Sequence, residues 1–137
     1  MASQIHVLDA SSIVRICLTR GLELPQNPIT IDLAKYEVFN AILVLSRRGL
    51  LEEDEVSKIT TYAERILGRI KMLSVNIREL REVCETAHQH GLTVYDAAYL
   101  YTAKKLGGIL VTEDKELLSK SKQMGVESRM ISGISNS

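Results

Sequence analysis

The stretch IHVLDASS, residues 5–12, joins a short apolar run to an abrupt polar end. The apolar run predicts a buried β-strand that stops at Asp9, because short buried strands are bounded by turn-forming residues. Ser11 and Ser12 are expected to cap a helix that runs to about Arg20. A strand followed directly by a helix is the first half of a parallel βαβ unit. This segment therefore predicts an α/β fold with an acid at the end of its first strand.

The rest of the chain continues this alternation of helices and strands. Helices are predicted at about 32–48, 52–67, 76–91, 93–106 and 114–124, and strands at 71–75, 109–111 and 126–131. Residues 21–31, with Pro25 and Pro28, are expected to be a loop. We therefore expect one domain over residues 1–131, with a parallel central sheet of about four to five strands and helices on both faces. Residues 132–137 are expected to be a disordered tail.

Composition excludes several classes of protein. The 17 basic and 17 acidic residues of the 137-residue chain cancel, so no overall charge draws it to nucleic acid or to an anionic membrane. No apolar run approaches the roughly 18 residues of a membrane span, and residues 1–12 do not have the pattern of a signal peptide. Cys17 and Cys84 lie in helical patterns without metal-ligand spacing, which favours free thiols. We expect a cytoplasmic protein that contacts nucleic acid only through local patches.

Four acids lie far apart in the sequence but at equivalent kinds of position. Asp9 follows the first predicted strand and Asp114 the third, and open parallel sheets bind ligands beyond the carboxyl ends of their strands. Glu37 falls in the apolar half of the second predicted helix, where an unpaired acid is costly. Asp96 flanks the apolar stripe of the fifth helix. Clustered carboxylates stay ionised only beside a cation, so the pattern predicts a site for a divalent metal.

Each acid also has a structural interpretation when it is taken alone. A salt bridge to a buried arginine would account for Glu37. Asp96 lies in the first turn of its helix, where an acid suits the helix dipole or a capping box that begins at Thr93. Asp114 would cap the helix that follows it, and Asp9 would be a turn residue. The coincidence of four such positions in one predicted sheet topology favours a joint site.

Four segments together resemble a known family: VLDASS at 7–12, YEVFNAI at 36–42, YDAAYL at 95–100 and VTEDKEL at 111–117. In order and spacing they resemble the PIN-domain ribonucleases. Among these, the short chain and the YDAAYL segment are most similar to the VapC toxins of prokaryotic toxin–antitoxin pairs. The resemblance covers nearly the whole chain.

The resemblance implies a metal-dependent endoribonuclease that cleaves RNA with Mg²⁺ or Mn²⁺. The acids that would hold the metal, here named the acidic quartet, are Asp9, Glu37, Asp96 and Asp114. The residues that match supporting polar positions of the family are Ser11, Asn40 and Thr112. Glu113 adjoins Asp114 and is an alternative to it as the fourth acid. The resemblance also implies a homodimer and a small antitoxin protein that inserts a peptide or helix near the acids.

Three competing interpretations remain open at this stage. A phosphorylatable receiver domain also gathers acids at the edge of a parallel sheet, but it predicts adjacent acids after an early strand, where this chain has only Asp9. An RNA-processing nuclease and a PIN fold that binds RNA or protein without cutting would share the same motifs. The helix at 52–67 carries an apolar stripe that we interpret as core, with a groove for a partner helix as the alternative.

Overall fold

The computed structural model describes residues 4–134, and its centre is a sheet in which every pair of neighbouring strands is parallel. The strands are β1 His6–Leu8, β2 Pro28–Ile31, β3 Lys71–Leu73, β4 Ile109–Val111 and β5 Ser128–Arg129, and they lie in the order β3-β2-β1-β4-β5. The helices are α1 Ala10–Leu18, α2 Leu33–Arg47, α3 Glu53–Gly68, α4 Ile77–His90, α5 Val94–Leu106, α6 Lys115–Gln123 and the 3₁₀ turn η1 Ile131–Gly133. The expected α/β fold with a parallel sheet is confirmed.

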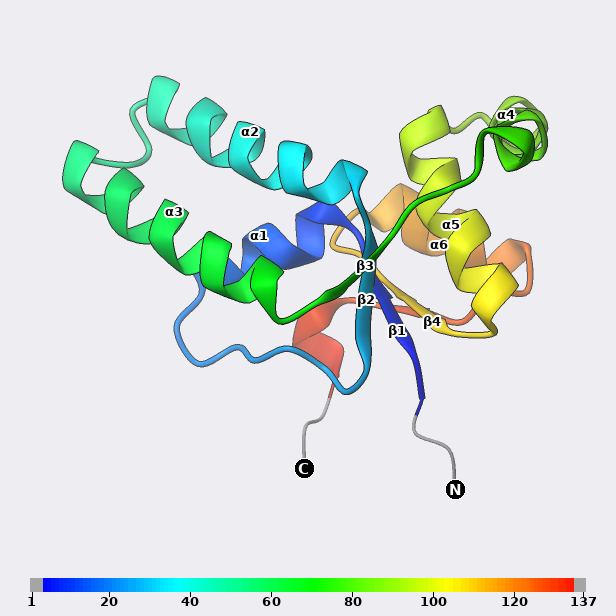
Figure 1. The fold of residues 1–137 in the computed structure, drawn as a ribbon, viewed down its shortest axis with the longest axis horizontal. Helices are drawn as coiled ribbons and strands as arrows, with labels where there is room; N and C mark the ends of the chain where they lie inside the picture. The colour runs from blue at the N-terminus through cyan, green and yellow to red at the C-terminus, as the bar shows by residue number, and fades with distance from the viewer. Residues whose placement is uncertain (1–3, 135–137) are drawn as a thin grey trace.

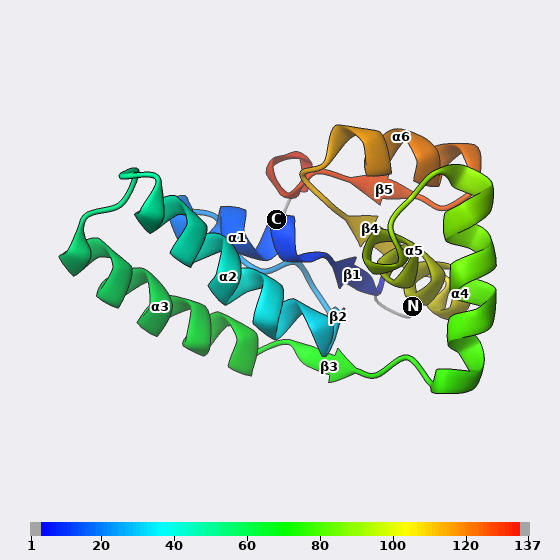
Figure 2. The ribbon, with the colours of Figure 1, turned by 90° about the horizontal axis from the view of Figure 1, so that it is seen from above.

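Two groups of helices flank the sheet, with α1, α2 and α3 on one side and α4, α5 and α6 on the other (Figures 1 and 2). The first three helices pack on one another, while α5 contacts β1, β2 and β4 and carries α4 on its outer side. Because β1 and β4 are covered on both faces, every residue of both strands is buried rather than every second one. The apolar stripe of α3 is core, as interpreted from the sequence: Ala63, Ile66 and Leu67 are buried.

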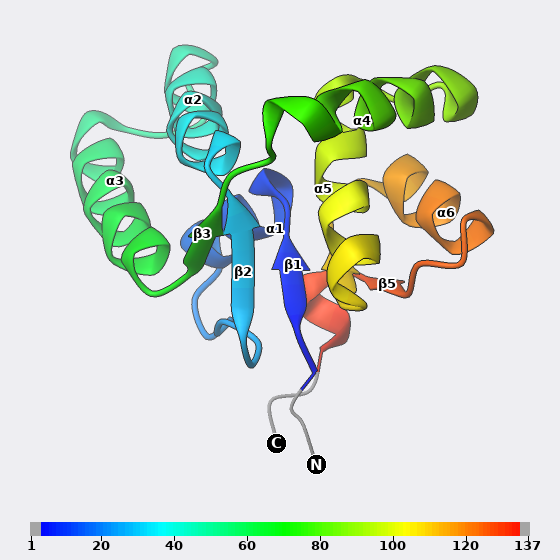
Figure 3. The ribbon, with the colours of Figure 1, turned by 45° about the vertical axis from the view of Figure 1, so that its right-hand side comes forward.

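The carboxyl ends of the strands meet the amino ends of the helices at one edge of the sheet. Figure 3 shows β1 and β2 pointing to the end of the molecule where α2 and α5 begin. Leu8 pairs with Val111 across the β1–β4 junction, so Asp9 and Thr112, the next residue of each strand, are neighbours. The N–H of Asp9 donates to the carbonyl of Val111 at 3.0 Å. The fold therefore brings segments from both ends of the chain to this edge.

The segment 21–31 contains a strand, β2, where the sequence predicted only a loop. Pro28 is the first residue of the strand, a position where a missing N–H is tolerated. Thr30 interrupts the apolar run, but it is fully buried and its hydroxyl donates to the carbonyl of Leu8 at 2.7 Å. The prediction was wrong because the strand depends on its partners β1 and β3 rather than on its own short sequence.

The beginning and the end of the fold also differ from the predictions. Asp9, not Ser11 or Ser12, caps α1, since its carboxylate accepts the N–H of Ser12 at 3.0 Å. The helix ends at Leu18, before the predicted Arg20. The tail expected to be disordered from 132 onward begins inside η1, and Ile134 packs on the core; residues 135–137 lie outside the described range. Within residues 4–134, no helix has the length and apolar character needed to cross a membrane.

Candidate acidic site at the carboxyl edge of the sheet

Asp9 is the most buried acid of the site. Asp9 is only 4% exposed and lies at the junction of β1 and α1. Oδ1 accepts the Ser11 hydroxyl at 2.7 Å and the Ser12 N–H at 3.0 Å, and Oδ2 accepts the Thr112 hydroxyl at 2.5 Å. Burial raises the pKa of Asp9 to about 6, and the charge of Asp96 adds to the rise while these hydrogen bonds oppose it. Asp9 is thus an acid whose ionised form is only partly compensated.

A hydroxyl network ties the loop after β4 to the start of α1. Thr112 is fully buried and, besides donating to Asp9, accepts the N–H of Asp114 at 3.0 Å. Ser11 accepts the N–H of Glu113 at 2.9 Å, and its oxygen lies 3.4 Å from that of Thr112. Ser11 therefore bonds both Asp9 and the backbone of the segment after β4, and Thr112 bonds Asp9 across the junction and the backbone of its own segment. Ser11 and Thr112 hold the two strand ends in register around the Asp9 carboxylate.

Glu37 is paired with a tyrosine rather than with an arginine. The Tyr99 hydroxyl donates to Oε1 of Glu37 at 2.7 Å, and Tyr99 itself is only 1% exposed. Its burial and the neighbouring carboxylates of Glu37 and Asp9 raise the pKa of Tyr99 far above its ordinary value. Sequence reasoning did not select Tyr99 as a site residue. The available signal was its spacing in YDAAYL, because three residues after Asp96 is the same face of a helix.

Asp96 lies in the first turn of α5, where the Thr93 hydroxyl caps the helix by accepting the Asp96 N–H at 3.1 Å. Burial raises the pKa of Asp96, and the charges of Asp114 and Glu37 raise it further, while the Thr93 bond lowers it. The capping interpretation is therefore correct for Thr93. The fields of two other quartet members nevertheless act on the Asp96 carboxylate, so the fold does gather these acids at one edge.

The carboxylates of Asp114 and Glu113 accept hydrogen bonds from different segments, α6 and the turn η1. Oδ1 of Asp114 caps α6 by accepting the N–H groups of Glu116 at 2.9 Å and Leu117 at 3.2 Å. Oε1 of Glu113 instead accepts the N–H of Ile131 at 2.8 Å and so joins the β4 loop to η1. Because Asp114 acts on Asp96 and Glu113 is bonded toward the C-terminal turn, this geometry favours Asp114 as the fourth acid.

The charges and ligand types of the quartet suit a hard divalent cation, but the side chains do not form a closed coordination sphere. Within the described residues, no Lys or Arg forms an ion pair with any of the four acids. Three or more Asp, Glu, His or Cys side chains also do not converge there closely enough to hold a metal. The carboxylates supply oxygen donors and uncompensated charge, which Mg²⁺ and Mn²⁺ require. In donor type and charge the quartet therefore suits such an ion.

The profile of the PIN domain family matches residues 7–123. The chain belongs to the PIN-domain family. It is similar to two curated proteins of Pyrobaculum aerophilum. Ribonuclease VapC3 is 38% identical over 122 residues, which cover 83% of this chain and 92% of that protein. Exonuclease VapC9 is 31% identical over 119 residues, which cover 85% of this chain and 86% of that protein. These similarities confirm the predicted resemblance to VapC-type PIN ribonucleases.

Two solved structures share the fold of this PIN domain. The crystal structure of PAE2754 from Pyrobaculum aerophilum superimposes with a TM-score of 0.75 at 29% identity, covering 93% of this chain and 92% of that one. FitAcB from Neisseria gonorrhoeae gives a TM-score of 0.62 at 14% identity, covering 95% and 100%. At that identity the second comparison supports the fold alone.

Asn40 is not drawn into the acidic site of this PIN domain. It lies on α2 one turn after Glu37, and its side chain is exposed. Across residues 4–134 it forms no side-chain hydrogen bond with the quartet or with Ser11 and Thr112. Its role as a supporting residue stays a prediction.

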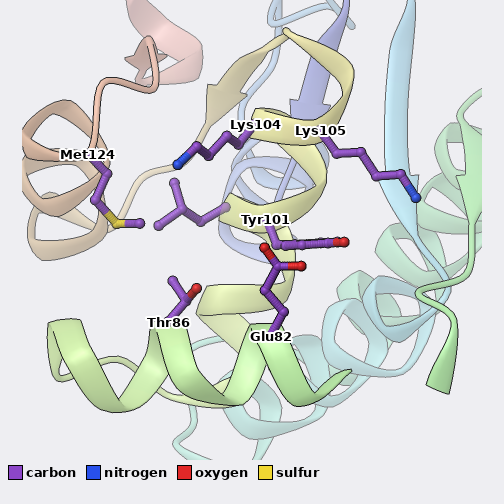
Figure 4. A pocket seen from close by; sticks show the side chains of 7 residues that line it. Glu82, Thr86, Tyr101, Lys104, Lys105 and Met124 are labelled. Carbon is purple, nitrogen blue, oxygen red and sulfur yellow. The ribbon is translucent and has the colours of Figure 1, made fainter. Parts of the chain in front are cut away.

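A cavity of about 270 Å³ lies apart from the quartet, among α4, α5 and α6 (Figure 4). The side chains that line it are Glu82, Thr86, Leu100, Tyr101, Lys104, Lys105 and Met124. Beside it, the Tyr101 hydroxyl donates to Glu79 at 2.6 Å, and Lys105 donates to the same oxygen at 2.6 Å. Two of the three tyrosines of α5 thus make the same kind of bond in different places, Tyr99 at the acidic site and Tyr101 away from it.

Proposed function

We propose that this PIN domain is a metal-dependent endoribonuclease of the VapC type that hydrolyses phosphodiester bonds in RNA at the acidic quartet. The observation that carries the proposal is the buried Asp9 carboxylate, which is held by Ser11, Ser12 and Thr112 without a cationic partner among the described residues. The names of the two relatives, a ribonuclease and an exonuclease, support nuclease activity. Perturbed acids at an edge of this kind are candidates for catalysis.

Mg²⁺ or Mn²⁺ is the proposed cofactor, with Asp9 and Asp96 as direct ligands and Glu37 and Asp114 completing the site. The raised pKa values of Asp9 and Asp96 support this assignment, since a cation would offset the repulsion that raises them. When bound, such a cation would supply Lewis-acid stabilisation of charge on the phosphate oxygens and lower the pKa of water.

The protein groups have separate tasks in this proposal. Ser11 and Thr112 orient the Asp9 carboxylate, and burial there strengthens its attraction to a cation. The amino end of α6 holds one oxygen of Asp114, which leaves the other for water or cation. Lys115 follows Asp114 and is exposed, so it is the basic residue best placed to contact the RNA backbone near the site.

We also propose a small antitoxin partner, a homodimer and a cytoplasmic location, as the resemblance to VapC toxins implies. Exposed apolar side chains on the outer face of α2, Tyr36, Phe39 and Leu43, support a protein partner. Both cysteines are free thiols, as expected in a reducing compartment.

Cleavage of labelled RNA by the purified protein tests the proposed function. In Mg²⁺ or Mn²⁺ we expect internal fragments, no fragments in EDTA, and none from Asp96→Asn purified in the same way, because that change removes one proposed ligand charge. A circular RNA of the same sequence should be opened, since an endonuclease needs no free end. Metal-independent cutting, or equal cutting by Asp96→Asn, would contradict the proposal.

The second candidate function is exonuclease activity, which the name of the relative Exonuclease VapC9 favours. An exonuclease would shorten the linear RNA from one end and leave the circular RNA intact. Binding of RNA without cutting of either form, on several structured RNAs, would instead favour a non-catalytic module. An RNA-processing nuclease differs from a toxin in its target, which expression of the chain in growing cells would reveal.

Replacing Glu113 with glutamine is expected to leave cation binding within about twofold of the wild type, because the amide oxygen can still accept the N–H of Ile131. Asp114→Asn, its matched comparison, should weaken binding clearly, since it removes charge from the quartet. Isothermal titration with Mn²⁺ measures both variants. Equal losses in the two variants would mean that Glu113 also acts as a ligand.

A further inference from the structure

One buried hydroxyl, that of Tyr99, connects two helices at the acidic site and lies beside the start of a third. It donates to Oε1 of Glu37 at 2.7 Å, and the backbone N–H of Ala10 lies near enough to lower the pKa of the same phenol. Tyr99 belongs to α5, Glu37 to α2, and Ala10 is the first residue of α1. Because an ionised carboxylate can only accept a hydrogen bond, the Tyr99 hydroxyl is the donor. The bond to Glu37 therefore has a fixed direction.

Each contact of Tyr99 adjoins a member of the quartet. Ala10 follows Asp9 directly, Glu37 is itself a member, and Asp96 lies one turn earlier on the same face of α5. At 1% exposure the ring and hydroxyl are sealed from solvent and from any substrate. Tyr99 therefore does not contact the reacting groups, and any effect on the site passes through the carboxylate it holds.

A glutamate on a helix has three side-chain torsions, and nothing on α2 itself orients Glu37. Repulsion from Asp96, whose pKa Glu37 helps to raise, would turn a free carboxylate away from the site. The Tyr99 bond opposes that movement by binding one carboxylate oxygen, which leaves the other without a hydrogen-bond partner among residues 4–134. Within residues 4–134, Glu37 has no basic partner that could do the same.

We propose that Tyr99 is a positioning residue, which fixes the Glu37 carboxylate so that the quartet can bind a divalent cation. The inference rests on the proposed function, since it assumes that Glu37 belongs to a cation site. Partners that orient metal-binding side chains typically change metal affinity by about 10- to 100-fold when they are removed. Mg²⁺ requires near-ideal octahedral geometry, whereas Ca²⁺ accepts irregular oxygen ligands. Loss of the Tyr99 bond should therefore weaken Mg²⁺ binding more than Ca²⁺ binding.

Tyr99→Phe tests the inference because it removes only the hydroxyl. Isothermal titration with each metal alone should give Mg²⁺ affinity lower by about 10- to 100-fold and a smaller loss for Ca²⁺. Tyr101→Phe is the matched control. Tyr101 also lies on α5, and its hydroxyl bonds Glu79 of α4 at 2.6 Å, so this variant should bind both metals as the wild type does. In a Glu37→Gln background, Tyr99→Phe should cause no further loss, because Tyr99 acts through the Glu37 charge.

A second variant tests the same geometry without changing Tyr99. Glu37→Asp keeps the charge but shortens the side chain, so it should no longer reach the phenol and should lose about as much Mg²⁺ affinity as Tyr99→Phe. Wild-type affinity for Mg²⁺ in Tyr99→Phe or in Glu37→Asp would overturn the positioning role alone. A wild-type protein that binds neither metal would instead overturn the proposed metal-dependent function. These two failures are therefore distinguishable.

Discussion

Asp9→Asn should abolish RNA cleavage and yet make the metal-free protein more stable at neutral pH. The pKa of Asp9 is about 6 in the folded protein against the ordinary value of 3.8 in the unfolded chain, so between these pH values the folded state binds more protons than the unfolded state. Stability contributed by the protonated form is present at low pH and is lost as the pH rises through about 6. The ionised acid then costs the fold about 3 kcal/mol at pH 7, by the usual conversion of a pKa difference. Asparagine removes this cost and can still cap α1.

Thermal melts in EDTA between pH 5 and pH 8 measure this effect. The wild-type melting temperature should fall as the pH rises, and Asp9→Asn should melt on the order of 10 °C higher than the wild type at pH 7. Part of the pH dependence should persist in the variant, because the raised pKa of Asp96 acts in the same direction. Glu64→Gln, an exposed acid on α3, is the control and should keep the wild-type pH profile. A wild-type protein that becomes more stable from pH 5 to pH 8 without metal would refute the argument.

The second large effect is expected from Gly108→Ala, at the start of β4. A Cβ at Gly108 would lie 2.9 Å from the carbonyl oxygen of Ile5 and 3.2 Å from its side chain. That oxygen also accepts the N–H of Ile109 at 2.9 Å, so the backbone cannot move aside without disturbing the β1–β4 junction. Overpacking of this kind costs about 1–3 kcal/mol, and the backbone contact places Gly108→Ala at the upper end.

Urea unfolding followed by circular dichroism measures the loss. Gly68→Ala provides the contrast, because nothing lies within 4 Å of the added Cβ at the last residue of α3. There alanine should raise the free energy of unfolding by roughly 0.5–1 kcal/mol, since it favours helix more than glycine does. A Gly108→Ala protein as stable as the wild type would contradict the prediction, because it would mean that Ile5 can move aside without loss of stability.

Local signals predicted those parts of the fold whose partners are close in the sequence. Asn76 and Thr93 were expected to cap their helices, and both accept an N–H within three residues. The runs at 5–8 and 109–111 were recognised as strands because they are short, largely apolar and bounded by turn-forming residues, and the structure has strands at His6–Leu8 and Ile109–Val111. By contrast β2 was missed, since its short run begins with Pro28 and is stabilised by pairing with β1 and β3.

The acids of the quartet could be selected from the sequence because each breaks or ends an apolar pattern, which makes its burial expensive unless it has a task. The side chains that bond these acids could not be predicted from the sequence. The Asp9 carboxylate bonds a hydroxyl 103 residues away, and Glu37 bonds one 62 residues away. The argument for Asp114 over Glu113 likewise depends on Ile131, which lies beside Glu113 because the preceding strand β5 pairs with β4.

The sequence by itself therefore predicted most of the alternation of elements, the caps Asn76 and Thr93 and the candidate acids, since these follow from the hydrophobic period and from bonds within a few residues. Only the tertiary structure decided that Thr112 bonds Asp9, that Tyr99 holds Glu37 and that Gly108 must lack a side chain. Such contacts depend on which strand ends and helix faces the folded chain brings together. Strand order and helix packing determine which side chains meet across the sheet. The residues next to a side chain in the sequence do not predict either of them.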